Sequence, residues 1–179
     1  MEYERSLDVE ELIVDCNVGF GPSFTVLDLG RFARLRVFEV GDNCFGFVET
    51  VKLVGLPHLE RVRIGTSCFS RSKDNDGSPI GSFCLTDCPH VKELSIDWKS
   101  FVGYALCEIA NDPYLEVVEV GDLARSGWSF HQGTLRMRSV FTWLYSSADL
   151  PKLKTLLIGR EALKKYTSAV FESECFRGD

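Results

Sequence analysis

Several chemical signatures are missing from this sequence, and their absence narrows the functions to consider. No stretch approaches the roughly 20 apolar residues of a membrane-spanning helix. The sequence has no GxSxG, no HExxH and no glycine-rich phosphate loop, and its cysteines lack the spacing of metal ligands. We therefore expect no catalytic site, no cofactor, no metal and no membrane contact.

Positive charge is also scarce. The chain carries 20 lysines and arginines against 26 acidic residues, a net charge of −6, which argues against a nucleic-acid partner because such surfaces need a positive stripe. Residues 1–12 are acidic and lack the apolar run of a signal peptide, so a cytoplasmic location is expected.

The chain contains seven cysteines, an odd number, and most of them occupy small or apolar positions of a repeat described below. Buried free thiols in a reducing compartment are the preferred interpretation. A disulfide between Cys44 and Cys68, with export to an oxidising compartment, is the alternative.

What the sequence does contain is one short motif that is repeated six times, called the phrase below. An apolar residue is followed by two variable residues, an apolar residue, one variable residue, Val or Ile, and then Gly or Asp. The copies span 9–15, 35–41, 59–65, 91–97, 115–121 and 153–159, and their Val or Ile positions are 26, 24, 32, 24 and 38 residues apart. A unit of about 24 residues cannot bury its own apolar face, so a repeat of this kind predicts a stacked solenoid.

Each unit predicts two short extended segments. The last two apolar positions of the phrase are two residues apart, which is strand spacing. A second pair with the same spacing follows in several units: Leu27 and Leu29, Val51 and Leu53, Phe83 and Leu85. Between the two pairs lies a large apolar residue, five positions after the Val or Ile: Phe45, Phe69, Phe101 and Leu163, with Phe20 one position late.

Longer spacings mark inserted segments, and the repeat stops before the end of the chain. Residues 70–82 and 123–138 are interpreted as two inserted loops. After the last phrase, 160–172 has apolar residues on one helical face and is predicted to be a helical cap. Little is available to cap the N-terminal end, so further repeats or another chain are expected there. The whole of 1–179 is thus a single, mainly β, solenoid domain.

The repeat resembles the leucine-rich repeat superfamily, and most closely its bacterial-surface-antigen-like variety. The segments that carry the resemblance are LPHLERVRIGTSCF (56–69), CPHVKELSIDWKSF (88–101) and LPKLKTLLIG (150–159). No copy has the asparagine that plant and vertebrate types place in the turn after the strand. The resemblance implies stacked parallel strands and a non-catalytic domain that binds a protein or another macromolecule on an exposed face.

Charge predicts how the units stack. The first variable residue of each phrase alternates in sign along the chain: Glu10, Arg36, Glu60, Lys92, Glu116, Lys154. Neighbouring strands favour opposite charges by about 0.2–1 kcal/mol. This alternation therefore predicts a column in which each residue lies beside its counterpart in the next unit.

The other variable positions are irregular and provide the candidate contact surface. They form two further columns, to which the aromatic residues of the phrase ends and of the second insertion are added as anchors. The candidate partner-binding residues are Val37, Glu39, Arg61, Arg63, Trp98, Val117, Glu119, Trp128 and Phe130. For Trp98, packing on Phe101 or on the inserted loop is the competing interpretation.

Three functions are compatible with the sequence. The first is a scaffold-like module for protein–protein interaction. The second is a structural or surface-antigen segment of a longer repeat array that has no dedicated partner. The third is a small enzyme or lectin site in 123–138, the segment that contains His131.

Overall fold

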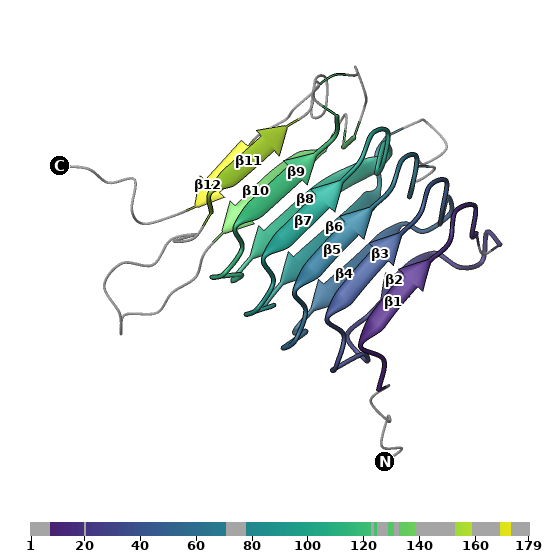
Figure 1. The fold of residues 1–179 in the computed structure, drawn as a ribbon. Helices are drawn as coiled ribbons and strands as arrows, with labels where there is room; N and C mark the ends of the chain where they lie inside the picture. The colour runs from purple at the N-terminus through teal and green to yellow at the C-terminus, as the bar shows by residue number, and fades with distance from the viewer. Residues whose placement is uncertain are drawn as a thin grey trace, which may run out of the picture.

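The computed structural model describes residues 8–19, 21–70, 78–122, 124, 129–130, 133–138, 153–158 and 169–172. They form two parallel β-sheets, and within each sheet the strands lie side by side in chain order (Figure 1). The predicted repeat of short stacked strands is therefore confirmed. No helix occurs among the described residues, so none there is long and apolar enough to cross a membrane.

The chain alternates between the two sheets, so each repeat unit, called a coil here, supplies one strand to each. The first sheet has the order β1 (Glu11–Val14), β3 (Val37–Val40), β5 (Arg61–Ile64), β7 (Glu93–Ile96), β9 (Val117–Val120) and β11 (Thr155–Ile158). The second has the order β2 (Val26–Asp28), β4 (Thr50–Val54), β6 (Gly81–Thr86), β8 (Tyr104–Ala110), β10 (Thr134–Arg138) and β12 (Ala169–Glu172). The first-sheet strands are the repeated phrases, and β2, β4 and β6 are the predicted second segments.

The core lies between the sheets because alternate residues of every strand point inward. In β7, Leu94 and Ile96 are almost fully buried, whereas Glu93 and Ser95 are half-buried on the outer face. The same inward positions contribute Phe38 and Val62 from neighbouring strands. One continuous cluster of buried apolar side chains results.

A stack of aromatic rings fills one end of this core. Phe45, Phe69, Phe101 and Phe130 are all buried, and successive ring centroids lie 5.3, 4.8 and 4.8 Å apart. Interplanar angles of 19°, 8° and 7° make the rings nearly parallel. Each phenylalanine has a positive φ, between 48° and 59°, which costs about 1–2 kcal/mol per residue outside glycine. The close packing of the rings offsets this cost.

The residue before each phenylalanine ties one coil to the preceding one. The side chains of Cys44, Cys68, Ser100 and Ser129 each donate a hydrogen bond to a carbonyl that follows a strand of the previous coil. The distances are 3.1, 3.0, 2.6 and 3.2 Å. This explains why only a small donor residue occurs at the position.

Tyr104 joins coils that are not neighbours. Its buried hydroxyl donates a 2.6 Å hydrogen bond to the carbonyl of Val48, 56 residues earlier. The ring crosses the intervening coil at Gly81, where a Cβ atom would lie 2.6 Å from the ring carbons. Glycine is therefore required at position 81 for this ring to pass.

The charge column has the predicted register. The backbone amides of Arg36, Glu60, Lys92, Glu116 and Lys154 each donate to the carbonyl of the preceding member of the column. Opposite charges meet in the Arg36 Nε–Glu60 Oε1 and Lys154 Nζ–Glu116 Oε2 pairs, at 2.9 and 3.0 Å. The alternation of sign is therefore a property of the stacked strands.

Lys92→Glu should lower the free energy of unfolding by about 1 kcal/mol, because the new carboxylate would lie between Glu60 and Glu116. For a domain of this size, thermal unfolding should shift down by about 2–4 °C. The melting temperature at low ionic strength measures this, and added salt should shrink the difference. Lys92→Gln is the control and should cost less. Equal melting temperatures for wild type and Lys92→Glu would contradict the importance of this column.

Three sequence predictions were wrong in part. The second insertion was drawn too long, because Ser129 and Phe130 rejoin the ladders and Thr134–Arg138 is strand β10. Likewise, Gly81 and Ser82 of the first insertion begin β6. The helical cap predicted over 160–172 is wrong for its last four residues, which form β12 beside β10; its other residues lie outside the described part of the chain.

Candidate functional site

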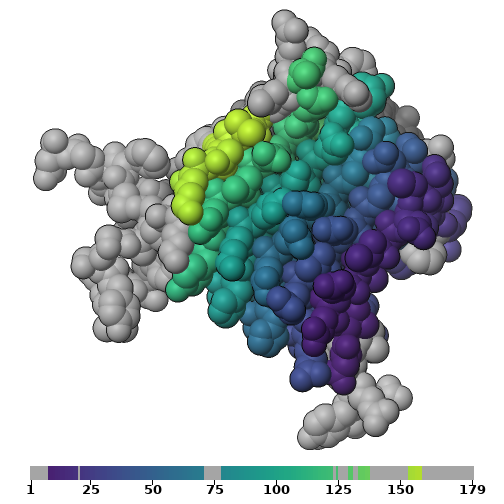
Figure 2. Space-filling model, viewed as in Figure 1, coloured from purple at the N-terminus to yellow at the C-terminus, as the bar shows by residue number. Residues whose placement is uncertain are grey.

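The outer face of the first sheet presents three columns of side chains. The charge column lies at the amino ends of the strands, and two further columns cross the middle of the face. The first of these is Glu11, Val37, Arg61, Glu93, Val117 and Thr155, and the second is Ile13, Glu39, Arg63, Ser95, Glu119 and Leu157. Figure 2 shows the strands of this face as parallel stripes in chain order. The structure thus places six of the nine candidate residues on one surface.

Charges on this face pair with one another. Arg63 Nη2 lies 2.9 Å from Glu93 Oε1, and Arg61 Nε lies 3.5 Å from Glu39 Oε1. The Ser95 hydroxyl donates to Glu119 at 3.4 Å. All three contacts join neighbouring strands, and in the two arginine–glutamate pairs opposite charges compensate one another across the sheet.

Pairing is also visible in the acid–base behaviour of the charge column. The hydrogen bond from Arg36 lowers the pKa of Glu60 below its ordinary value, and the positive charges of Arg36 and Lys92 act in the same direction. The same hydrogen bond and the charge of Glu60 raise the pKa of Arg36. Both side chains are exposed, so solvent screens the pair and it stabilises the fold only weakly.

The two candidate valines do not form a contiguous apolar patch. Val37 and Val117 are half-buried in the same column, but Arg61 and Glu93 lie between them. The face therefore presents a charge pattern and a shape rather than one large apolar area.

A shallow groove lies at the carboxyl ends of β5, β7 and β9. Its volume is about 470 Å³, and it reaches from Arg63 and Gly65 across Asp97 to Glu119 and Leu157. It therefore contains two of the candidate residues, Arg63 and Glu119, with carboxylates and an aliphatic side chain around them. Its mixture of charges suits an extended polypeptide, which offers amides and charges of both signs.

Trp98 follows the end of β7 and is half-buried. Its backbone amide donates to its neighbour Asp97 at 2.6 Å, and the ammonium of Lys99 lies 4.3 Å from the ring centroid. Trp98 follows Asp97, a residue of the groove, but is not among the residues that line the groove. Trp128 and His131, the other residues of interest in this part of the sequence, lie outside the described residues.

Phe130 is not a partner-binding residue in the folded chain. It is 1 % exposed and stacks on Phe101, so a partner cannot reach its ring without opening the core. The sequence carried a signal for this, because Ser129–Phe130 repeats the small-residue–phenylalanine pair of the earlier coils.

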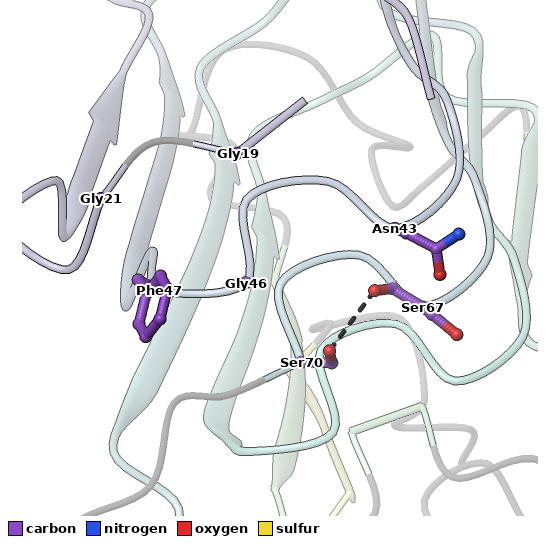
Figure 3. Close-up of a pocket in the computed structure, with 7 residues that line it drawn as sticks. All are labelled: Gly19, Gly21, Asn43, Gly46, Phe47, Ser67 and Ser70. Carbon is purple, nitrogen blue, oxygen red and sulfur yellow. Dashed lines mark hydrogen bonds between the residues drawn. The ribbon is translucent and has the colours of Figure 1, made fainter. Parts of the chain in front are cut away.

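A second depression lies on the turns of the first coils, and the sequence analysis missed it. Gly19, Gly21, Gly46 and Phe47 line it on one side, with Asn43, Ser67 and Ser70 on the other (Figure 3). The Ser70 hydroxyl donates to the Ser67 carbonyl at 3.3 Å. Its volume is about 430 Å³ and its lining has no ionisable side chain. The only sequence signal is the cluster of glycines.

Four cysteines are buried in the core, which lowers the reactivity of their thiols. Cys44, Cys68, Cys88 and Cys107 are buried and free, as the preferred interpretation predicted. Burial raises the pKa of the Cys68 and Cys88 thiols to about 12, so both are protonated at neutral pH and are poor nucleophiles. Among the described residues, no three His, Cys, Asp or Glu side chains are grouped to hold a metal ion.

One buried carboxyl group stands apart from the outer face. Asp112 is 1 % exposed; its Oδ1 accepts a 2.8 Å hydrogen bond from the Cys88 amide, and its Oδ2 has no hydrogen-bond partner in the described structure. Burial raises its pKa to about 8, with a further contribution from the charge of Asp87. It occupies the position that holds Leu56 and Cys88 in the two previous coils, so its ionisation bears on stability.

Comparison of this chain with protein-family models, with curated proteins and with solved structures finds no match.

Proposed function

We propose that this protein is a non-catalytic interaction module of the leucine-rich-repeat type, and that it binds an extended protein segment along the groove at the carboxyl ends of β5, β7 and β9. The observation that supports this most directly is the groove itself. It brings Arg63, Asp97 and Glu119 together from three successive strands beside Leu157. These groups supply charges of both signs and an apolar contact within reach of one polypeptide.

Rigidity supports the proposal. The groove residues sit on, or one residue beyond, strands held in a continuous parallel ladder, and Asp97 is fixed by hydrogen bonds from Thr66 and from the amide of Trp98. A partner therefore meets side chains that are already placed, which lowers the entropic cost of binding. We propose the half-buried Trp98, the residue after Asp97 in the chain, as an additional aromatic contact.

The test is selection of peptides from a displayed random library on the intact protein, followed by calorimetric titration of the best binder. We expect Arg63→Ala and Glu119→Ala each to weaken the selected peptide by about 1–2 kcal/mol, as for partly buried charged contacts at an interface. Trp98→Ala should weaken it as well.

Lys52→Ala is the matched control, because Lys52 is an exposed charged residue on the outer face of the other sheet. It should leave the affinity unchanged. Equal loss in Lys52→Ala and Arg63→Ala, or failure of the library to yield any binder, would contradict a site in the groove.

The self-pairing of charges favours a second candidate function, a structural segment of a repeat array. Arg61 and Arg63, the basic residues of the two middle columns, each pair with a carboxylate of a neighbouring strand, so the middle of the face has no basic side chain that is free of such a pair. If this is the function, the peptide selection should give no binder, whereas Lys92→Glu should still lower the free energy of unfolding.

A further inference from the structure

The first sheet ends in two strands with an unpaired edge in the described structure, β1 and β11. The carbonyls of Glu10 and Val14 accept hydrogen bonds from β3 and its flanking residues. Because peptide groups alternate in direction along a strand, those of Glu11 and Ile13 point away from β3, toward the open edge. Such an edge offers donors and acceptors to another parallel strand.

Apolar side chains are uncovered at the same two ends. Ile13 is 61 % exposed on β1, and Leu156 and Ile158 are each 37 % exposed on β11. In β7, in the middle of the stack, the counterparts of Leu156 and Ile158 are at most 1 % exposed. The inward residues of β11 therefore lack the neighbouring coil that covers the same positions elsewhere.

Charge at the two ends is complementary. The alternating column begins with Glu10 and ends with Lys154, so one more coil after Lys154 would continue the alternation with an acidic residue. Lys154 is 68 % exposed at its side chain, although it already contacts Glu116 at 3.0 Å. The N-terminal end supplies the acidic residue that the C-terminal end would accept.

We propose that the two ends bind each other in different copies of this chain, with β11 of one copy pairing in parallel with β1 of the next. The register of the existing strands places Lys154 beside Glu10, Leu156 beside Leu12, Leu157 beside Ile13 and Ile158 beside Val14. Every one of these neighbours is compatible: an opposite-charge pair at one end, two apolar pairs inside, and an apolar pair that covers Ile13 outside.

The second sheet permits the same stacking. Each coil contributes one strand to each sheet, and the sheets end in the same two coils, with β2 at one end and β12 at the other. One translation along the stack therefore brings both pairs of edges together. A contact between two different surfaces that repeats by translation does not close into a ring, so growth is open-ended rather than limited to a dimer.

Sedimentation velocity of the whole chain over a wide concentration range tests the proposal. We expect the mean mass of the wild type to rise past that of a dimer. Lys154→Glu places two acids at the junction, and Glu10→Lys places two bases there. Each should weaken association about tenfold, since an attractive pair becomes a repulsive one. Lys52→Glu makes the same change of net charge as Lys154→Glu, away from both ends, and should leave association unchanged.

Mixing the two variants separates the junction from any effect on folding. In an equimolar mixture, the new acid at position 154 of one variant faces the new base at position 10 of the other, and the remaining ends form the wild-type junction. The mixture should therefore associate as strongly as the wild type, although neither variant does so alone. Circular dichroism of each variant checks that the strands are intact.

Three results would overturn the proposal: a wild type that stays monomeric at the highest concentration, association that stops at a dimer and ignores both charge reversals, or a mixture that associates no better than its components. Ile13→Pro is a further check, because it removes the amide donor at the open edge without touching the peptide groups that face β3. It should abolish association in the wild-type background.

Discussion

Replacing Phe101 by alanine is expected to lower the free energy of unfolding by about 4–5 kcal/mol, the upper end for removal of a buried aromatic ring. The ring is fully buried and has four aromatic neighbours. It stacks on Phe69 and Phe130 at 4.8 Å and meets Phe83 and Tyr104 edge-on at 5.2 and 4.8 Å. A domain of this size has about 5–15 kcal/mol of stability, so the variant should lose most of its margin. Urea unfolding followed by circular dichroism measures the change.

Two further variants separate the contribution of the buried ring from that of the backbone conformation. Phe47→Ala removes a phenylalanine that is 39 % exposed and should cost about 1 kcal/mol or less. Phe101→Gly tests the backbone, because φ at this position is 59°. Glycine normally destabilises a strand or turn relative to alanine, but here it should equal or exceed alanine in stability because it adopts this φ without strain. If Phe101→Gly were clearly less stable than Phe101→Ala, the positive φ at this position would not be a source of strain.

Asp112→Asn is expected to stabilise the protein at alkaline pH by about 3 kcal/mol and to have little effect near pH 4. The reason is the buried carboxyl group, whose pKa burial raises from 3.8 to about 8. In the folded chain the group therefore keeps its proton up to about pH 8, whereas in the unfolded chain it ionises near its ordinary value. Between these two values the folded state binds the extra proton, so the free energy of unfolding falls as pH rises.

The size of the expected change in stability follows from the shift in the pKa of Asp112, and so does the pH range over which to measure it. A shift of this size corresponds to at most about 5–6 kcal/mol, and relaxation of the turn lowers the effect to about 3 kcal/mol. Urea unfolding of wild type and variant from pH 4 to pH 9 should give curves that diverge above pH 4 and run parallel above about pH 8. Asp8→Asn is the control, since the Asp8 side chain is 79 % exposed. A difference between wild type and Asp112→Asn that is constant over the whole range would assign it to shape rather than to ionisation.

Much of this fold could be predicted from the sequence because two periodic patterns agree: the spacing of the apolar residues and the alternation of charge at the first variable position. The apolar spacing alone locates the strands but does not determine which residues lie beside one another on neighbouring strands. The alternation from Glu10 to Lys154 adds the register, since only one alignment puts every acid beside a base. The outer columns that contain Arg63 and Glu119 follow from that register without further information.

Strand β10 does not follow from the regular spacing of the repeat. Three earlier coils place the phenylalanine five residues after the Val or Ile, whereas Phe130 comes ten residues after Val120. With five added residues the repeat spacing no longer marks Phe130, so the sequence pattern predicts a loop over the whole of 123–138. Leu135 and Met137, which lie inward on β10, carried the strand spacing of the second segments all along.

The C-terminal error has a different cause. Helical spacing of apolar residues in 160–172 competes with strand pairing, and Ala169–Glu172 pairs with β10 instead. An edge strand offers a row of backbone donors and acceptors that a helix would leave unpaired. Local pattern alone cannot weigh that tertiary contribution.

The candidate site was predictable only in its outline. Positions of Arg61 and Glu39 follow from the register, but their pairing with one another depends on side-chain conformations that no spacing specifies. The groove depends on how the chain turns after Ile96 and Val120, which varies among the coils. The glycine-lined depression near Phe47 is missed for the same reason.

In an ideal solenoid each repeat senses only the two beside it, so cooperativity decays along the stack as in a one-dimensional chain of coupled units. The hydrogen bond from Tyr104 to Val48 breaks that rule, since it passes over one coil to reach the next. The second, third and fourth coils are thereby joined at a single point, and none of them can open while the bond is kept. Fraying that starts at either end should therefore halt there, which makes the middle of the molecule one unfolding unit and the outer coils separate ones.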